Sequence, residues 1–188
     1  MKRSLVVVSN RLPFVININE DGEPVRTNSA GGLVTALAPL VIKHRGYWVG
    51  WAGNNFTKTM KIPDSKDSTA IGHGIKPSQI IPIFFTKETY QSFYNGFCNA
   101  TLWPLMHSLP TLAVFKAEQW NSYVNVNEKF ANAAFQAVKK FDDYADRNNL
   151  VWIHDYQLMV TPMMLRNLLD EANISCKLAF FLHIPFPS

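Results

Sequence analysis

The stretch Leu5-Val6-Val7-Val8-Ser9-Asn10 decides the fold. A continuous apolar, β-branched run that ends in turn-forming residues is typical of a strand buried on both faces of a parallel sheet. Four later apolar runs predict further strands: Tyr47 to Trp51, Ile80 to Phe85, Leu150 to His154 and Lys177 to Leu182. Pro82 places the run from Ile80 at an edge of the sheet or only partly paired.

Helical periodicity separates these strands. Apolar faces predict one helix from Gly31 to Gly46, kinked or split by Pro39, and a second over residues 87 to 107, broken by Gly96 and Pro104. Two more have apolar stripes made of Phe130, Ala134, Val138 and Phe141, and of Leu165, Leu168, Leu169 and Ala172. Asp21-Gly22 predicts a small hairpin at the edge of the sheet. Strands alternating with helices predict an α/β fold, a Rossmann-like doubly wound parallel sheet.

Composition argues against several classes of protein, including nucleic-acid-binding and membrane proteins. A length of 188 residues suits one domain, and a net charge of +4 spread along the chain argues against a nucleic-acid partner. Cys98 and Cys176 form no C-x-x-C pair, so we expect free thiols and neither a zinc site nor a disulfide. No apolar run approaches the roughly 20 residues of a membrane span, and the first is too short for a signal peptide. We therefore expect a cytoplasmic protein with no membrane partner.

Common catalytic fingerprints are missing, including the P-loop, the Gly-x-Gly-x-x-Gly turn and the Gly-x-Ser-x-Gly elbow. Polar and aromatic residues instead gather at the carboxyl ends of the expected strands, where ligands bind in open α/β sheets. These positions are Ser9-Asn10-Arg11, Trp48 to Trp51, His154-Asp155-Tyr156 and His183.

Each candidate has a functional and a structural interpretation. The Arg11 guanidinium suits a phosphate or carboxylate, or forms a surface ion pair. The segment Ser29 to Leu33 could hold an anion at a helix start, or be a tight turn. Asp155 could accept sugar hydroxyls or act as a base, or cap the next helix.

His183, Tyr94 and Trp103 also have a functional and a structural interpretation each. His183 lies on an apolar strand, where a lone histidine is more often a core residue with satisfied hydrogen bonds. Tyr94 and Trp103 could stack on a sugar or contact a phosphate, but aromatic residues at such spacing usually belong to the core.

Six motifs, in order, resemble the trehalose-phosphate synthase family. They are VVVSNRLP from Val6, SAGGLVTAL from Ser29, WVGWAG from Trp48, FYNGFCNATLWPLMH from Phe93, VWIHDYQLMVTPMMLR from Val151 and FFLHIPFPS from Phe180. The resemblance spans the chain from end to end.

The resemblance implies the N-terminal, acceptor-side domain of a GT-B glycosyltransferase, which transfers glucose from UDP-glucose to glucose 6-phosphate with retention. It implies acceptor contacts from Arg11, Tyr94, Trp103 and Asp155, with Asp155 near the reacting hydroxyl. Gly32 and His183 match donor-side positions, beside the diphosphate and the transferring glucose, so that Asp155 and His183 are the catalytic candidates. Trp51 matches an aromatic position loosely, and Trp48 is an equal candidate.

The resemblance also implies no metal and no cofactor, in agreement with the missing aspartate-x-aspartate pair. We expect residues 1–188 to form this domain alone, truncated at the C-terminus and without the nucleotide-sugar domain, and hence to have little activity. The alternative is a noncatalytic module that senses glucose phosphate or regulates a trehalose synthase complex. Homo-oligomerisation and association with full-length subunits both stay open.

Overall fold

The computed structural model describes residues 4–28, 31–53, 56–67, 69, 72, 74–141 and 148–187. Five parallel strands form the central sheet in the order β5-β4-β1-β6-β7. Their bounds are Leu5–Arg11 for β1, Tyr47–Trp51 for β4, Ile80–Ile83 for β5, Leu150–His154 for β6 and Lys177–Phe181 for β7. The strand order reverses between β1 and β6, as in a doubly wound Rossmann-like sheet, so the predicted fold class is confirmed.

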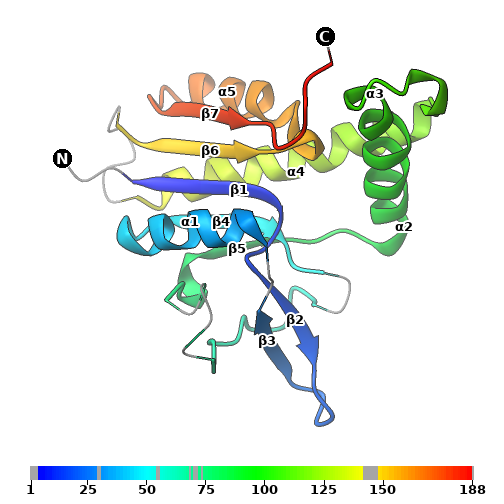
Figure 1. Ribbon diagram of the computed structural model, residues 1–188. Coiled ribbons are helices and arrows are strands. Elements are labelled where there is room, and N and C mark those ends of the chain that lie inside the picture. Colours follow the sequence, from blue (N-terminus) through cyan, green and yellow to red (C-terminus); the bar gives the residue numbers. More distant parts are fainter. Residues whose placement is uncertain are drawn as a thin grey trace.

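Helices cover both faces of the sheet (Figure 1). Helix α1 (Gly32–Lys43) packs on one face, in a core cluster that includes Val7, Trp48 and Val41. Helices α4 (Ala117–Lys139) and α5 (Thr161–Glu171) pack on the other face, in a cluster that includes Val8, Phe130 and Leu165. Alternate residues of β1 enter the two clusters, which is the pattern expected for a strand buried on both sides.

A two-stranded antiparallel hairpin projects from the sheet at the end of β1 (Figure 1). It consists of β2 (Phe14–Ile18) and β3 (Pro24–Asn28), and Gly22 in the turn has a φ of 80°. The Arg26 guanidinium lies 3.8 Å from the Phe14 ring centroid and donates a hydrogen bond to the Ile75 carbonyl oxygen. The predicted hairpin is confirmed, and the hydrogen bond of Arg26 connects it to the loop before β5.

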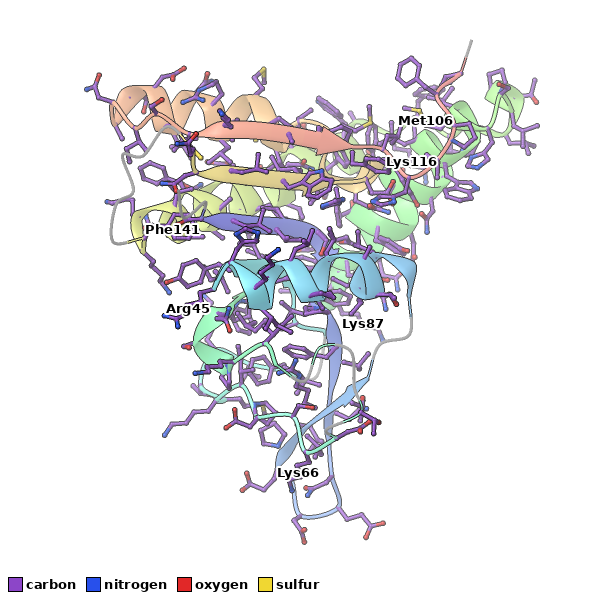
Figure 2. All side chains as sticks on the ribbon, turned by 60° about the vertical axis from the view of Figure 1, so that its left-hand side comes forward. Arg45, Lys66, Lys87, Met106, Lys116 and Phe141 are labelled. Carbon is purple, nitrogen blue, oxygen red and sulfur yellow. The ribbon has the colours of Figure 1, made fainter. Side chains whose placement is uncertain are left out.

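A helical arm stands beyond the carboxyl ends of the strands. It runs without interruption through α2 (Lys87–Tyr90), the π-helix η2 (Gln91–Leu102) and α3 (Trp103–Met106). Figure 2 shows Lys87 and Met106 at this end of the sheet, and Arg45 and Phe141 at the opposite end. Short 3-10 helices complete the fold: η1 (Pro77–Gln79), η3 (Pro110–Leu112) and η4 (Tyr156–Leu158).

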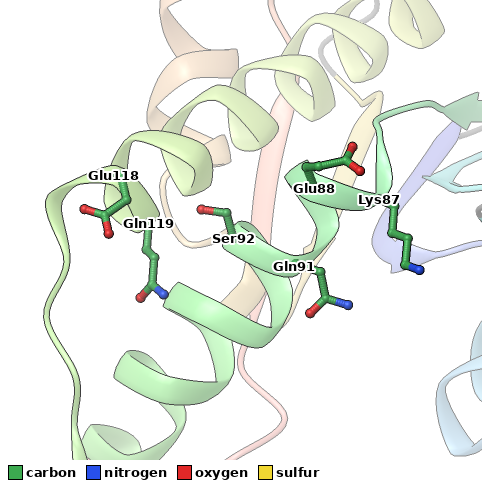
Figure 3. Close-up of a pocket in the computed structure, with 6 residues that line it drawn as sticks. All are labelled: Lys87, Glu88, Gln91, Ser92, Glu118 and Gln119. Carbon is green, nitrogen blue, oxygen red and sulfur yellow. The ribbon is translucent and has the colours of Figure 1, made fainter.

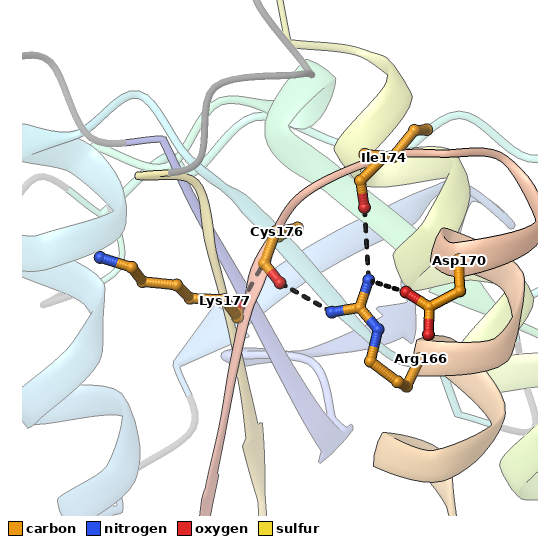
Figure 4. A network of polar contacts seen from close by, with 5 residues as sticks. All are labelled: Arg166, Asp170, Ile174, Cys176 and Lys177. Carbon is orange, nitrogen blue, oxygen red and sulfur yellow. Dashed lines mark hydrogen bonds and ion pairs between the residues drawn. The ribbon is translucent and has the colours of Figure 1, made fainter.

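The turn between α5 and the edge strand β7 is fixed by Arg166 (Figure 4). Its guanidinium donates hydrogen bonds to the carbonyl oxygens of Cys176 and Ile174 and forms an ion pair with Asp170 at 2.8 Å. Cys176 and Cys98 are free and buried, as expected, and burial raises the pKa of both thiols. Among the residues described, no helix combines the length and apolar character that a membrane crossing requires.

Four details of the sequence prediction are wrong. Pro39 was expected to kink or split the first helix, and α1 is not split, since it continues through Pro39 to Lys43. Neither Gly96 nor Pro104 breaks the helical arm: Gly96 is buried in the π-helix against Gln119, and Pro104 lies in the first turn of α3, which continues from η2. The first helix ends at Lys43 and not at Gly46, and the residue with positive φ after it is Arg45. Position 46 requires glycine because a Cβ there would lie 2.2 Å from the Leu5 carbonyl oxygen. Ala172 is exposed, since α5 ends one residue earlier.

Candidate active site

Arg11 lies at the end of β1 inside a group of aromatic rings from β4, α2 and η2. Its guanidinium is 5.7 Å from the Trp51 ring centroid and 5.8 Å from that of Tyr94, and it donates a hydrogen bond of 2.9 Å to the Tyr90 hydroxyl. Tyr90 stacks on Trp51 at 4.4 Å and on Tyr94 at 5.0 Å. We call these four residues the arginine–aromatic cluster. The cluster holds an exposed guanidinium in one orientation without an acidic partner among the described residues.

The local backbone explains how Arg11 reaches this place. The pairing of β1 with β4 shifts between Val8 and Arg11, which is a bulge at the strand end. A Cβ on Gly50 of β4 would lie 2.7 Å from the Arg11 carbonyl carbon and from the Leu12 nitrogen. Only glycine therefore allows the bulged backbone to pass so close to β4.

Asp155 follows β6 directly and has a φ of 77°, an unusual backbone conformation for a residue other than glycine. Its Oδ1 accepts hydrogen bonds from the backbone N–H groups of Tyr156 (3.0 Å) and His183 (3.2 Å). The helix-cap interpretation is thus observed, since Asp155 caps η4. Oδ2 has no hydrogen-bond partner in the described part of the chain, and Asp155 is only half-buried, so this oxygen is free for a ligand.

Trp103 reaches the same region from the start of α3. Its ring lies 5.6 Å from the Tyr156 ring, and the Tyr156 hydroxyl donates a hydrogen bond to Asn99 Oδ1 at 2.9 Å. Burial raises the pKa of Tyr94 and Tyr156, and the neighbouring phenols add to this effect, so both hydroxyls keep their protons at neutral pH. They can therefore act as hydrogen-bond donors. Trp103 itself is 43% exposed, so it is not a core residue.

A cleft of about 170 Å³ opens where β1 and β6 end beside the start of α1. Its lining includes Asn10, Arg11, Gly31, His154 and Asp155. The bare backbone at Gly31 and Gly32 faces open space, because a Cβ on either residue would contact nothing within 4 Å. A helix start of this kind attracts anions through its free N–H groups and its dipole.

Two buried polar atoms at this cleft have no partner in the described part of the chain: Asn10 Oδ1 and His154 Nε2. The other nitrogen of His154, Nδ1, lies 3.1 Å from Nε2 of His183. Burial, and to a smaller extent the neighbouring His183, lower the pKa of His154 to about 4. His154 is therefore neutral at physiological pH.

Two side chains of α4 hold the segment after Asp155 in place by hydrogen bonds. Asn127, fully buried, donates to the Gln157 carbonyl oxygen at 3.0 Å and accepts from the Thr161 N–H at 3.1 Å and the Thr161 hydroxyl at 2.8 Å. Tyr123 donates its hydroxyl to the Tyr156 carbonyl oxygen at 2.7 Å. These bonds fix the turn that carries Asp155 and Tyr156.

Comparison with known proteins gives the family. The sequence model of glycosyltransferase family 20 matches residues 3–188. The chain belongs to glycosyltransferase family 20.

Relatives within the family are named as trehalose-phosphate synthases. The trehalose-6-phosphate synthase of Mycobacterium sp. (strain JLS) is 42% identical over 182 residues, which are 97% of this chain and 33% of that protein. The α,α-trehalose-phosphate synthase [UDP-forming] of Schizosaccharomyces pombe is 40% identical over 99% of this chain and 34% of its own length. The chain thus spans about a third of the length of these relatives.

Solved family structures have the same fold. A UDP-forming α,α-trehalose-phosphate synthase from Burkholderia vietnamiensis aligns over 100% of this chain and 36% of its own, with a TM-score of 0.68 and 30% identity. The enzyme from Burkholderia xenovorans, solved in complex with glucose-6-phosphate, aligns over 98% of this chain and 35% of its own, with a TM-score of 0.62 and 30% identity.

Within this family fold, the structure brings most of the predicted site residues together. Arg11 and Tyr94 share the arginine–aromatic cluster, Arg11 and Asp155 line one cleft, and Trp103 joins them through Tyr156. The two tryptophan candidates lie on opposite faces of β4. Trp51 belongs to the cluster, whereas Trp48 is fully buried on the α1 side, donates to Ser9 Oγ at 2.8 Å and lines the cleft with Arg11 and Asp155. Ser29 and Ala30 of the second motif lie outside the described residues.

Sequence reasoning missed Tyr90 as a member of the site, and it named Asn10, His154 and Tyr156 only as parts of strand-end segments, without a role. The spacing of four residues between Tyr90 and Tyr94 was an available signal, because it places both rings on one helical face. Asn10 and His154 line one cleft, as expected for residues at the carboxyl ends of neighbouring parallel strands.

A larger cleft of about 540 Å³ lies elsewhere, between the helical arm and the start of α4 (Figure 3). It is lined by Lys87, Glu88, Gln91, Ser92, Glu118 and Gln119. None of the predicted site residues lines it, and the carboxylates among its lining side chains suit a phosphate poorly. Size alone therefore does not identify the site.

Proposed function

We propose that this chain forms the acceptor side of a glucosyltransferase that transfers glucose from UDP-glucose to glucose 6-phosphate with retention, giving trehalose 6-phosphate and UDP. The observation that carries the proposal is the arginine–aromatic cluster beside the Asp155 carboxylate. A fixed guanidinium suits a phosphate, and a free carboxylate oxygen a short way along the same cleft suits sugar hydroxyls.

On the acceptor side, the Arg11 guanidinium and the Tyr94 hydroxyl would bind the phosphate. Charge-assisted hydrogen bonds to arginine are among the strongest in proteins, and the Tyr90 contact already orients the guanidinium. Trp103, 43% exposed at the end of the arm, would stack on the sugar ring. Asp155 Oδ2 would accept a hydrogen bond from a hydroxyl of the acceptor sugar near the one that attacks the donor.

On the donor side, the start of α1 at Gly32 would lie against the diphosphate, with the helix dipole opposing its charge. His183 would contact the transferring glucose. The departing phosphate would take the proton from the attacking hydroxyl, so that this chain has to position the reactants and stabilise charge rather than supply a nucleophile.

We propose further that the groups which clamp the nucleotide lie outside residues 1–188, in a second domain. The chain alone should then release little UDP from UDP-glucose and glucose 6-phosphate, because the leaving diphosphate would not be neutralised. The proposed compartment is the cytoplasm, since both substrates are phosphorylated and do not cross membranes unaided.

Calorimetric titration of the chain with glucose 6-phosphate tests the acceptor site. Arg11→Ala should weaken binding at least about 10-fold, as loss of a charge-assisted hydrogen bond does. Arg45→Asn is the matched control, because it removes the same charge at the opposite end of the sheet and asparagine tolerates the φ of 49°. Equal affinities of the two variants would refute the acceptor site. UDP release by the unmodified chain at rates typical of enzymes, about 1 per second or more, would refute the proposal that the groups which clamp the nucleotide lie outside residues 1–188.

A further inference from the structure

His154 does not have the environment of an ordinary core histidine. Its side chain is 2% exposed, yet only one ring nitrogen has a partner: Nδ1, at 3.1 Å from His183 Nε2. Nε2 is buried without a partner in the described part of the chain. A histidine with a purely structural role would satisfy both nitrogens, because a buried polar atom without a hydrogen bond costs stability.

His183 is exposed and is held from two directions. Its backbone N–H donates to Asp155 Oδ1 at 3.2 Å, and its ring lies 4.7 Å from the Phe181 ring. The Nδ1–Nε2 contact with His154 is the polar contact that the structure gives its ring. The rotation of the His183 ring therefore depends on His154.

The contact also determines where the protons lie. A hydrogen bond of 3.1 Å between the two facing nitrogens requires one N–H between them, donated by one ring and accepted by the other. Because His154 is neutral at physiological pH, the direction of this bond also decides whether its other nitrogen carries a proton. The tautomer of either ring then fixes that of its partner. His154 itself cannot rotate freely, since its ring packs against Trp152 at 5.0 Å and Phe181 at 6.4 Å.

We propose that His154 is a positioning residue, which fixes the ring orientation and the tautomer of His183 through the Nδ1–Nε2 hydrogen bond. The consequence for glucose transfer rests on the proposed function, because it assumes that His183 contacts the donor sugar. The hydrogen bond and its effect on His183 do not depend on that assumption.

Three substitutions of His154 distinguish the position of its hydrogen-bonding atom from the polarity of the side chain as a whole. His154→Asn places an amide near the former Nδ1 and keeps a partner for His183. His154→Gln carries the same amide one bond farther, near the former Nε2, and loses that partner. His154→Phe keeps the ring shape and removes both nitrogens. Trp152→Phe is the control, because it changes a ring that packs on His154 without touching the hydrogen bond.

The first measurement is the ¹⁵N spectrum of the histidine rings in the labelled chain at pH 7.5, where protonated and bare ring nitrogens are well separated. His183 should show one tautomer in the unmodified chain, Trp152→Phe and His154→Asn. It should show averaged tautomers in His154→Gln and His154→Phe. A single unchanged tautomer of His183 in all five proteins would overturn the proposal.

The second measurement works at low protein concentration and needs neither sugar nor nucleotide. Diethylpyrocarbonate modifies neutral imidazole nitrogens, and peptide mass spectrometry gives the rate at His183, with His107 as internal reference. The rate should rise roughly 2- to 10-fold in His154→Gln over His154→Asn, the range of one neutral hydrogen bond. Equal rates in these two variants would also overturn the proposal. Because no substrate is present, this outcome is separate from a failure of the proposed function.

Discussion

Asn127→Ala is the substitution that tests how α4 supports the site. In the folded chain the Asn127 amide contacts the Gln157 carbonyl oxygen, the Thr161 N–H and the Thr161 hydroxyl, all of them buried. Alanine is a good helix former, so the helix itself should not suffer. The cost comes from the polar groups that lose their partner.

The magnitude follows from two of these groups. The Gln157 carbonyl oxygen and the Thr161 N–H would each lose a hydrogen bond, at about 1–3 kcal/mol for a buried unsatisfied group. We expect a loss of about 2–5 kcal/mol in the free energy of unfolding, since water can reach part of the site. For a domain of this size each kcal/mol lowers Tm by roughly 2–4 °C, so Tm should fall by at least about 4 °C.

Asn132→Ala is the matched control. Asn132 lies on the same helix, and its Nδ2 donates the same type of bond to the Glu128 carbonyl oxygen at 2.9 Å, but it is exposed. Its removal should change the free energy of unfolding by less than about 0.5 kcal/mol. Thermal and urea unfolding followed by circular dichroism measure both variants. If the two lose the same stability, the buried network does not hold the turn after β6 and the reasoning is wrong.

Three further predictions concern the strand ends. Tyr90→Phe removes the partner of Arg11 and should weaken glucose 6-phosphate binding roughly 2- to 10-fold in calorimetry, whereas Tyr47→Phe at the other end of the sheet should not. Gly50→Ala should cost about 1–3 kcal/mol in urea unfolding because its Cβ would overlap the Arg11 backbone, whereas Gly32→Ala, with open space around its Cβ, should cost nothing; equal effects would contradict the close approach. The third prediction is a pH dependence. The pKa of His154 is about 4 in the folded chain and 6.5 when unperturbed, so the unfolded chain binds more protons in this window. Its contribution to stability is complete above pH 6.5 and is lost as pH falls towards 4, by about 3 kcal/mol at 1.36 kcal/mol per pKa unit. Urea midpoints between pH 7.5 and 4 should therefore fall less steeply in His154→Phe than in the unmodified chain; parallel slopes would contradict the assigned pKa.

Local sequence patterns predicted the elements that depend on local physics. The run from Leu5 to Val8 is apolar at every position because both faces of β1 are covered, and this feature can be read without any knowledge of the covering helices. Asp21-Gly22 predicted a hairpin because a glycine can adopt the positive φ that the turn needs. Predictions failed where packing overrides local preference. Gly96 was expected to break a helix, but it lies within the π-helix η2 and packs against Gln119.

Some residues of the candidate site could be predicted from the sequence and others could not. Arg11, Asp155 and His183 could be predicted because parallel strands bring their carboxyl ends to one edge of the sheet. Tyr90 was missed because its importance comes from a hydroxyl that meets Arg11 across 79 positions of the chain. Trp48 and Trp51 lie three residues apart on β4, so strand alternation already places them on opposite faces of the sheet, but the sequence does not tell which face Arg11 and the aromatic rings share.

By itself the sequence determined the parallel sheet, its hairpin and the edge at which the candidate site lies, because burial patterns and turn residues act over a few neighbouring positions. Only the tertiary structure decided which side chains meet there. The pairing of His154 with His183 and of Arg11 with Tyr90 depends on strand order and helix placement, which join residues that no local periodicity connects.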